Sequence, residues 1–189
     1  MTDAMRVRGT AGAGRSARGF TTLEVIVVLV IGVIVSVIAV PNLIGTIQRY
    51  RVRGGADQVM SELRRLQSLA MTTGTRHRLA VADCASGPSP CKRYRIEREA
   101  SGTWPAVSDG TGTNANVLSE WVDLQRVYSS VRIASLKDAG SLDVSGVVYD
   151  SRGASATPGA SYPLTFVIAH ASGAQRTVVV RSAGSVRMP

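Results

Sequence analysis

The sequence predicts an α+β fold in which one long N-terminal helix packs on antiparallel β-sheet. A largely apolar run from residue 20 to residue 47 is followed by apolar positions spaced three and four apart up to residue 70, the pattern of a helix with one packed face. Beyond Gly74 the period changes to two, in short runs separated by Gly-rich loops without intervening helices. This order favours an antiparallel sheet.

Length and charge bound the class of protein. The chain has 189 residues, enough for one modest domain with appendages, and a formal charge of +9. Residues 1–19 contribute four arginines against one aspartate, or +3, so the remainder carries +6. Aromatic residues make up only 5% of the chain, and the core must therefore consist mainly of Val, Leu, Ile and Ala.

The apolar run is long enough to cross a membrane. Residues 25–40 carry no charge, and the apolar stretch around them exceeds the roughly 20 residues that cross a bilayer core. A secretory signal peptide would have a shorter apolar region and a small-residue cleavage site after it. The arginines before the run predict an N-terminus that stays in the cytoplasm. Glu24 interrupts the run, and an ionisable residue in such a segment indicates a function.

The following stretch, residues 49–74, is predicted to continue as an amphipathic helix. Its apolar side is interrupted only by Gln67, and we expect this side to pack on the sheet. Gly54 and Gly55 are interpreted as a bend between an exposed and a packed half, and Gly74 as the C-terminal cap. The apolar side consists of Ala56, Val59, Met60, Leu63, Leu66 and Ala70.

Residues 75–189 are predicted to form a β-rich domain. The run at 93–99 has few apolar residues and is the weakest strand, while the last two long runs predict a hairpin. The predicted strands are residues 76–82, 93–99, 119–126, 146–150, 162–170 and 175–182, with a short last run at 185–189.

The two cysteines, Cys84 and Cys91, bracket a short ring rich in Gly, Pro and Ser. In an exported domain this spacing predicts a local disulfide. The alternatives are two free thiols or half of a metal site. A zinc site needs about four ligands, and no second Cys or His pair lies nearby in the sequence, so we expect no metal.

The sequence offers little for catalysis. Its two histidines are His77 and His170, and no G-x-S-x-G elbow supplies a nucleophile for a triad. The stretch at 109–114 contains G-x-G, but no helix is predicted after it, so it is interpreted as a loop and not as a phosphate cradle. We therefore expect no enzyme, no catalytic residue and no cofactor.

The stretch RGFTTLEVIVVLVIGVIVSVIAVPNL resembles the class III signal of type IV pilins and type II secretion pseudopilins. The likeness lies in the Gly19–Phe20 junction, in Glu24 five residues into the mature chain, and in Pro41 with Asn42 at the end of the apolar run. It implies a pilin-like fold and a prepilin peptidase that cuts after Gly19 and methylates Phe20. Residues 1–19 would then be a cleaved leader, and residues 20–48 a transmembrane helix used in assembly.

The resemblance also implies a role for Glu24 in assembly. Cleavage creates an ammonium group on Phe20, which lies four residues before Glu24 and could pair with it in one helix. In the family, the glutamate of an incoming subunit is thought to meet the terminal ammonium of a subunit already in the filament. Such a pair is worth far more at low dielectric than in water. Pro41 should bend or loosen the helix, because it cannot donate a backbone hydrogen bond.

The C-terminal half resembles the GspH/FimT-type branch of this family, through VVYDSRGAS at 147–155 and VVVRSAGSVR at 178–187. The branch implies a minor pseudopilin of type II secretion in the bacterial inner membrane, with residues 75–189 in the periplasm. Its partners would be prepilin peptidase, other major and minor pseudopilins or pilins, and membrane lipid.

The alternatives are a minor type IV pilin, a FimT-like module that binds DNA for uptake, and an inert anchored domain. The DNA-binding alternative would use a basic surface with Arg176, Arg181 and Arg187. The similar DNA-binding pilins carry a Gly-Arg-x-Arg element near the C-terminus. Here the matching residues are 184–187, and Ser185 stands where the first arginine would be.

Overall fold

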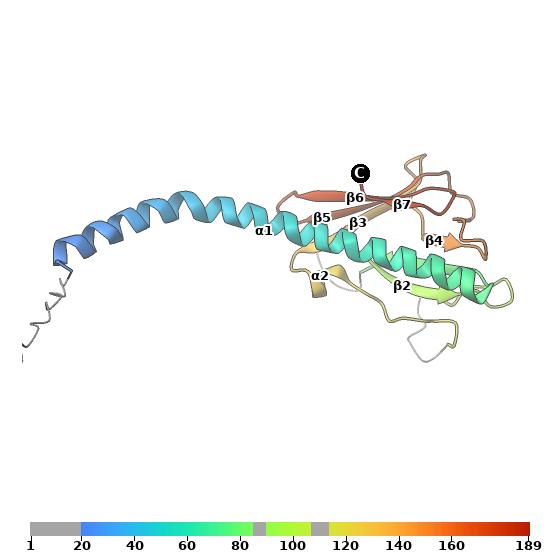
Figure 1. Cartoon of the computed structure of the whole chain (residues 1–189). Coiled ribbons are helices and arrows are strands. Elements are labelled where there is room, and N and C mark those ends of the chain that lie inside the picture. The colour runs from blue at the N-terminus through green and yellow to red at the C-terminus, as the bar shows by residue number, and fades with distance from the viewer. Residues whose placement is uncertain (1–19, 85–89, 107–113) are drawn as a thin grey trace, which may run out of the picture. The chain divides into compact units, whose positions relative to one another are not determined.

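The computed structural model describes residues 20–84, 90–106 and 114–189 (Figure 1). The predicted leader and Gly19 lie outside these ranges. Contacts within the chain divide it into two compact units, Met1–Asn42 and Leu43–Pro189, which are described separately below.

One helix accounts for the whole N-terminal part of the described chain. Helix α1 comprises Thr22–Thr73, close to the bounds predicted from the apolar pattern. At its start the Thr21 hydroxyl accepts a 3.2 Å hydrogen bond from the backbone N–H of Glu24, which is the geometry of an N-terminal cap. At its end Gly74 has φ +65°, and the predicted glycine cap is confirmed.

In the described residues after α1, seven strands form one sheet in which paired strands are antiparallel, in the order β4-β1-β2-β3-β5-β6-β7. The link between β2 and β3 consists of a single registered pair, Lys92 with Ile133. The sheet therefore has two well-paired parts, β4-β1-β2 and β3-β5-β6-β7. The strands are β1 His77–Asp83, β2 Lys92–Arg98, β3 Val131–Lys137, β4 Gly146–Tyr149, β5 Leu164–His170, β6 Gln175–Val180 and β7 Val186–Arg187.

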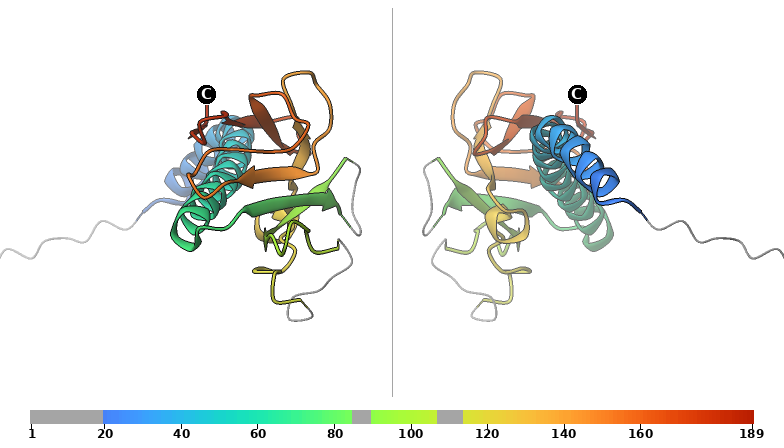
Figure 2. Two further views of the ribbon diagram at one scale, coloured as in Figure 1. Left: turned by 90° about the vertical axis from the view of Figure 1, so that its right-hand side faces the viewer. Right: turned by 90° about the vertical axis from the view of Figure 1, so that its left-hand side faces the viewer.

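The core lies between one face of this sheet and the second half of α1. Figure 2 shows the green part of α1 lying beside the sheet. The apolar side predicted from spacing is confirmed, because the helix residues at the core are at most 1% exposed, while Met60 is partly buried against it. They meet alternate residues of the strands, such as Leu79, Ile96, Phe166 and Val178. The helix contributes Val52, Ala56, Val59, Leu63, Leu66 and Ala70.

The glycine pair in α1 allows the sheet unit to approach the helix closely. A Cβ on Gly54 would lie 2.8 Å from the Tyr128 ring, and one on Gly55 would lie 3.0 Å from a methyl of Val131. The helix continues through both glycines. The two glycines therefore serve close packing through their small size, and not the bend that was expected.

Two strand predictions need correction. Residues 119–126 are not a strand: Val122 makes an isolated bridge to Tyr94, and Leu124–Val127 form the short helix α2. Asp123 starts that helix by accepting a 2.9 Å hydrogen bond from the N–H of Gln125. Strand β3 was not predicted at all, although its buried residues Val131 and Ile133 alternate with Arg132.

Candidate functional site

The apolar segment, which we define as residues 20–42, is a long exposed surface within its unit. By length and composition α1 could cross a membrane, and none of its most apolar 18-residue window is buried. Large apolar side chains are exposed all along it, from Phe20 at 83% to Ile38 at 73%. An exposed surface of this size indicates a lipid or protein environment.

Within the apolar segment, Glu24 lies where it can serve two purposes. It occupies the third helical position after the cap residue Thr21, the position that a capping box assigns to Glu or Gln. It also lines the same surface hollow as Phe20, together with Val25 and Val28. Phe20 and Glu24 are therefore neighbours on one side of the helix start. An ammonium on Phe20 would be close to a carboxylate.

The other two predicted residues at this end of the chain are Pro41 and Gly19. Pro41 lies within the helical assignment of α1, and its side chain is outside the description. Gly19, the residue before the predicted cut, is also outside the described ranges. Cleavage after Gly19 and methylation of Phe20 thus stay predictions.

The cysteine pair is settled by the structure. Cys84 and Cys91 are joined in a disulfide with Cα atoms 5.5 Å apart. The Asp123 carboxylate lies within 4.8 Å of both sulfurs, so the three side chains have the arrangement of a partial metal site. Sulfurs bonded to each other are not thiolate ligands, and the disulfide prediction holds against both alternatives.

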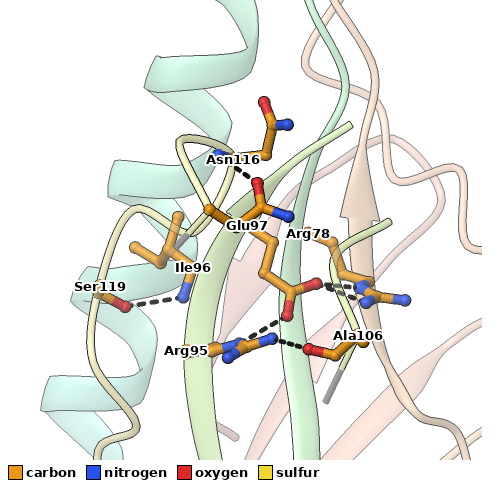
Figure 3. A network of polar contacts seen from close by, with 8 residues as sticks. Arg78, Arg95, Ile96, Glu97, Ala106, Asn116 and Ser119 are labelled. Carbon is orange, nitrogen blue, oxygen red and sulfur yellow. Dashed lines mark hydrogen bonds and ion pairs between the residues drawn. The ribbon is translucent and has the colours of Figure 1, made fainter. Parts of the chain in front are cut away.

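A charged network occupies the sheet face opposite α1 (Figure 3). Arg95 Nε donates a 2.7 Å hydrogen bond to Oε1 of Glu97, and both side chains are 0% exposed. The second oxygen, Oε2, accepts hydrogen bonds from Nε of Arg78 at 2.9 Å and from its Nη2. Arg95 also donates a 2.6 Å hydrogen bond to the Ala106 carbonyl. One carboxylate thus holds two guanidinium groups from neighbouring strands.

Tryptophans from the segment between β2 and α2 cover this network. Arg78 stacks on the Trp104 ring at 4.8 Å, and Arg95 stacks on Trp121 at 4.5 Å. On the same segment, the Ser119 hydroxyl accepts a 2.8 Å hydrogen bond from the N–H of Ile96. The network therefore attaches residues 99–106 and 114–123 to the sheet. Its buried charges are engaged with each other, so we interpret it as structural.

Sequence reasoning missed this network, although the signal was present. Arg95 and Glu97 are two apart in a strand and so share a face, while register places Arg78 opposite Glu97. The predicted weakness of this strand came from its charged residues. In the structure two of these charges, Arg95 and Glu97, pair with each other and are buried.

The three arginines of the DNA-binding alternative do not form one surface. Arg176 pairs with Ile168, and Arg187 pairs with Val179. Residues 176 and 179 of one strand point to opposite sheet faces, because the side chains alternate. Arg176 thus lies on the face that carries α1, and Arg187 on the other. Arg181 directly follows β6 and is exposed.

The glycine of the C-terminal element has a structural reason. Gly184 has φ +82°, and a Cβ there would overlap the Gly153 carbonyl oxygen. That oxygen accepts a 2.7 Å hydrogen bond from Nε2 of Gln67, the polar residue that interrupts the predicted apolar side of α1. Gly153 lies between β4 and β5, so this contact joins the helix to two separate turns.

Both histidines form hydrogen bonds with residues two positions away in the chain. His77 is 1% exposed, and its Nδ1 lies 3.0 Å from the Thr75 carbonyl, to which it donates. His170 accepts a 3.0 Å hydrogen bond at Nδ1 from the N–H of Ser172, within a local turn.

Three side chains of the described residues have shifted pKa values. The carboxylate of Asp138 accepts hydrogen bonds from the backbone N–H groups of Ser161 and Leu142, which lower the pKa of this carboxyl. Burial raises the pKa of the Tyr94 and Tyr149 hydroxyls.

The fold is similar to solved pilin-type structures. The minor pseudopilin EpsH from the Type 2 Secretion System of Vibrio cholerae superposes with a TM-score of 0.50 and 12% identity, over 74% of this chain and 96% of that chain. The type IV minor pilin FimU of Pseudomonas aeruginosa gives 0.48 and 15%, over 75% of this chain and 90% of that chain. No family model and no curated protein matches the chain. The likeness to EpsH shows a pilin-like fold, as expected.

Proposed function

We propose that this chain is a subunit of a filament of the pilin and pseudopilin type. The observation that carries the proposal is the division of α1: its second half is buried against the sheet, whereas its first half exposes apolar side chains throughout. A membrane can cover that segment before assembly, and helices of neighbouring subunits can cover it in a filament. The pilin-like fold supports the same assignment.

More specifically, we propose a minor pseudopilin of a type II secretion machine. In this proposal prepilin peptidase removes residues 1–19, residues 20–48 anchor the chain in the inner membrane with the N-terminus inside, and residues 75–189 lie in the periplasm. The Cys84–Cys91 disulfide supports an exported domain, because disulfides persist in oxidising compartments. The other pseudopilins of the machine would be its assembly partners, and the function requires no catalytic residue.

The DNA-uptake alternative has less support. Arg176 lies on the sheet face opposite that of Arg187, and Ser185 replaces an arginine of the resembling element. Gly184, the glycine of that element, is required by the packing against Gly153. A backbone-binding surface needs its arginines to face one duplex. We therefore do not propose DNA as a partner.

Glu24 provides the test of assembly. Its proposed role is to pair with the ammonium of Phe20 from a neighbouring subunit. Its competing role is to cap α1. Glu24→Gln removes the charge but keeps a residue that suits the capping box, whereas Glu24→Ala removes both. We expect both variants to lose incorporation into filaments, measured by cross-linking in cells that carry the secretion machinery, with exposed Glu120→Gln as the control. Normal incorporation of Glu24→Gln would overturn the charge-pairing role.

Processing is tested separately by mass spectrometry of the membrane-bound protein. We expect a chain that begins at an N-methylated Phe20. An intact leader in cells with active prepilin peptidase would contradict the proposal and favour an inert anchored domain.

A further inference from the structure

A hollow lies between α1 and the β5–β6 hairpin. Arg49 and Val52 line it from the helix, and Ala174, Gln175 and Arg176 line it from the hairpin. Val52 is 1% exposed and provides an apolar base, whereas Arg49 and Arg176 are exposed. We call this site the arginine hollow. Two arginines from segments that are far apart in the sequence thus line one hollow.

The charge of the arginine hollow is not neutralised by acids of the described chain. Arg53, one turn further along α1, has Asp57 at 3.9 Å. Within residues 20–84, 90–106 and 114–189, neither Arg49 nor Arg176 has a carboxylate within the 4.0 Å of an ion pair. Two cations bordering one hollow repel each other, and an anion between them would relieve that repulsion. Guanidinium groups suit phosphate in particular, since they can donate two parallel hydrogen bonds.

The position of the hollow along α1 points to the surface of a membrane. Ile47, still 41% exposed, is the last large apolar side chain before it, and Tyr50, beside Arg49, is 68% exposed. Tyrosine is enriched at the headgroup level of bilayers, and arginines near the end of a span extend to that level. If residues 25–44 fill a hydrocarbon core, Arg49 lies about 7.5 Å beyond it along the helix, within the headgroup region.

We propose that Arg49 and Arg176 bind the phosphate of an anionic phospholipid headgroup, with the Gln175 amide as a further donor. The inference rests on the proposed function, because it requires residues 20–42 to enter a membrane. A zwitterionic lipid offers the same phosphate but adds a cation, which the two arginines repel. The bound headgroup holds the β5–β6 hairpin at the membrane surface, so a subunit must release it before it leaves the membrane.

The test uses the full chain in mild detergent and native mass spectrometry. Phosphatidylglycerol and phosphatidylcholine are added in separate titrations, and inorganic phosphate is added in a third. We expect the wild type to retain phosphatidylglycerol preferentially. The variants Arg49→Gln and Arg176→Gln should each lose roughly fivefold in that retention, and the double variant should bind both lipids equally. Arg181→Gln removes an exposed arginine away from the hollow and should behave as the wild type.

Three results would overturn the inference. Equal retention of both lipids by the wild type would show a non-selective lipid shell. Competition by inorganic phosphate at the same concentration as phosphatidylglycerol would assign the hollow to a free anion. An equal loss of phosphatidylglycerol retention in Arg181→Gln would show that the net charge of the protein, and not the arginine hollow, determines lipid binding. Each result would leave the proposed function intact, whereas release of the chain from membranes by alkaline carbonate would refute membrane anchoring itself.

Discussion

Arg95 and Glu97 form an ion pair in which both side chains are fully buried, at 2.7 Å, on the sheet face that α1 does not cover. Glu97 also holds Arg78, so one carboxylate serves two guanidinium groups. The two ends of the pair are therefore not equivalent. Loss of the acid removes the carboxylate that both arginines share, but loss of Arg95 leaves the acid still paired with Arg78.

We predict that Glu97→Leu lowers the free energy of unfolding by about 3–5 kcal/mol, and that Arg95→Met lowers it by clearly less. Urea unfolding of the full chain in detergent, followed by tryptophan fluorescence, measures both. Glu99→Gln is the control, because Glu99 pairs with the partly exposed Arg76 and should cost no more than about 1 kcal/mol. Equal losses for Glu97→Leu and Arg95→Met would contradict the asymmetry.

The contact between two turns at Gly184 gives a second prediction. Gly184→Ala requires both a left-handed conformation and a Cβ that overlaps the Gly153 carbonyl. Gly173→Ala has the same conformational problem at φ +92° but open space around the Cβ. We expect Gly173→Ala to cost roughly 1–2 kcal/mol and Gly184→Ala to cost substantially more. Thermal unfolding of the two variants side by side measures the difference, and equal melting temperatures would refute the packing role.

The disulfide closes a ring of eight residues, from Cys84 to Cys91. Loop entropy predicts that its loss, in Cys84→Ser with Cys91→Ser, lowers the free energy of unfolding by roughly 2.5 kcal/mol. Urea unfolding measures the free energy of unfolding of the wild type and of the double variant, each with and without reductant. Reductant should lower the stability of the wild type to that of the variant and leave the variant unchanged. A stability of the wild type that is insensitive to reductant would contradict this.

Asp138 should make stability depend on pH. Backbone N–H groups, first that of Ser161 and then that of Leu142, lower the pKa of its carboxyl below the ordinary 3.8. A pKa that is lower in the folded state stabilises the fold above the unfolded value, and this contribution is lost as pH falls through the folded value. We therefore expect the wild type to exceed Asp138→Asn in stability by a constant amount above about pH 5. The gap should shrink below pH 4, and a gap unchanged down to pH 2 would exclude the carboxylate as its cause.

The apolar pattern of α1 was enough to predict its bounds and its packed side. Ala56, Val59 and Leu63 lie on one side of any helix of that sequence, so the prediction did not depend on knowing the sheet. The role of Gln67, in contrast, could not be predicted from the pattern of α1. Its donation to the Gly153 carbonyl requires a turn 86 residues later in the chain. No local pattern contains that information.

Among the strands, too, the local pattern predicted some elements, whereas others depended on the assembled sheet. Strand β5 alternates buried and half-buried residues along its length, and its pattern predicted it well. Residues 119–126 lack this regular alternation and pair with β2 through an isolated backbone bridge, that of Val122 with Tyr94. Whether such a run becomes a strand depends on the partner available to its backbone, which is a property of the assembled sheet.

Local chemistry therefore accounts for the exposed apolar segment, for Glu24 within it and for the short cysteine ring, because length, period and spacing along the chain carry those signals. Long-range contact accounts for the pairing of Arg78 with the buried Glu97, the tight packing at Gly184 and the position of Arg49 and Arg176 around one hollow. Such contacts join residues that are distant in the chain, and their energies exist only once the sheet has brought those residues together.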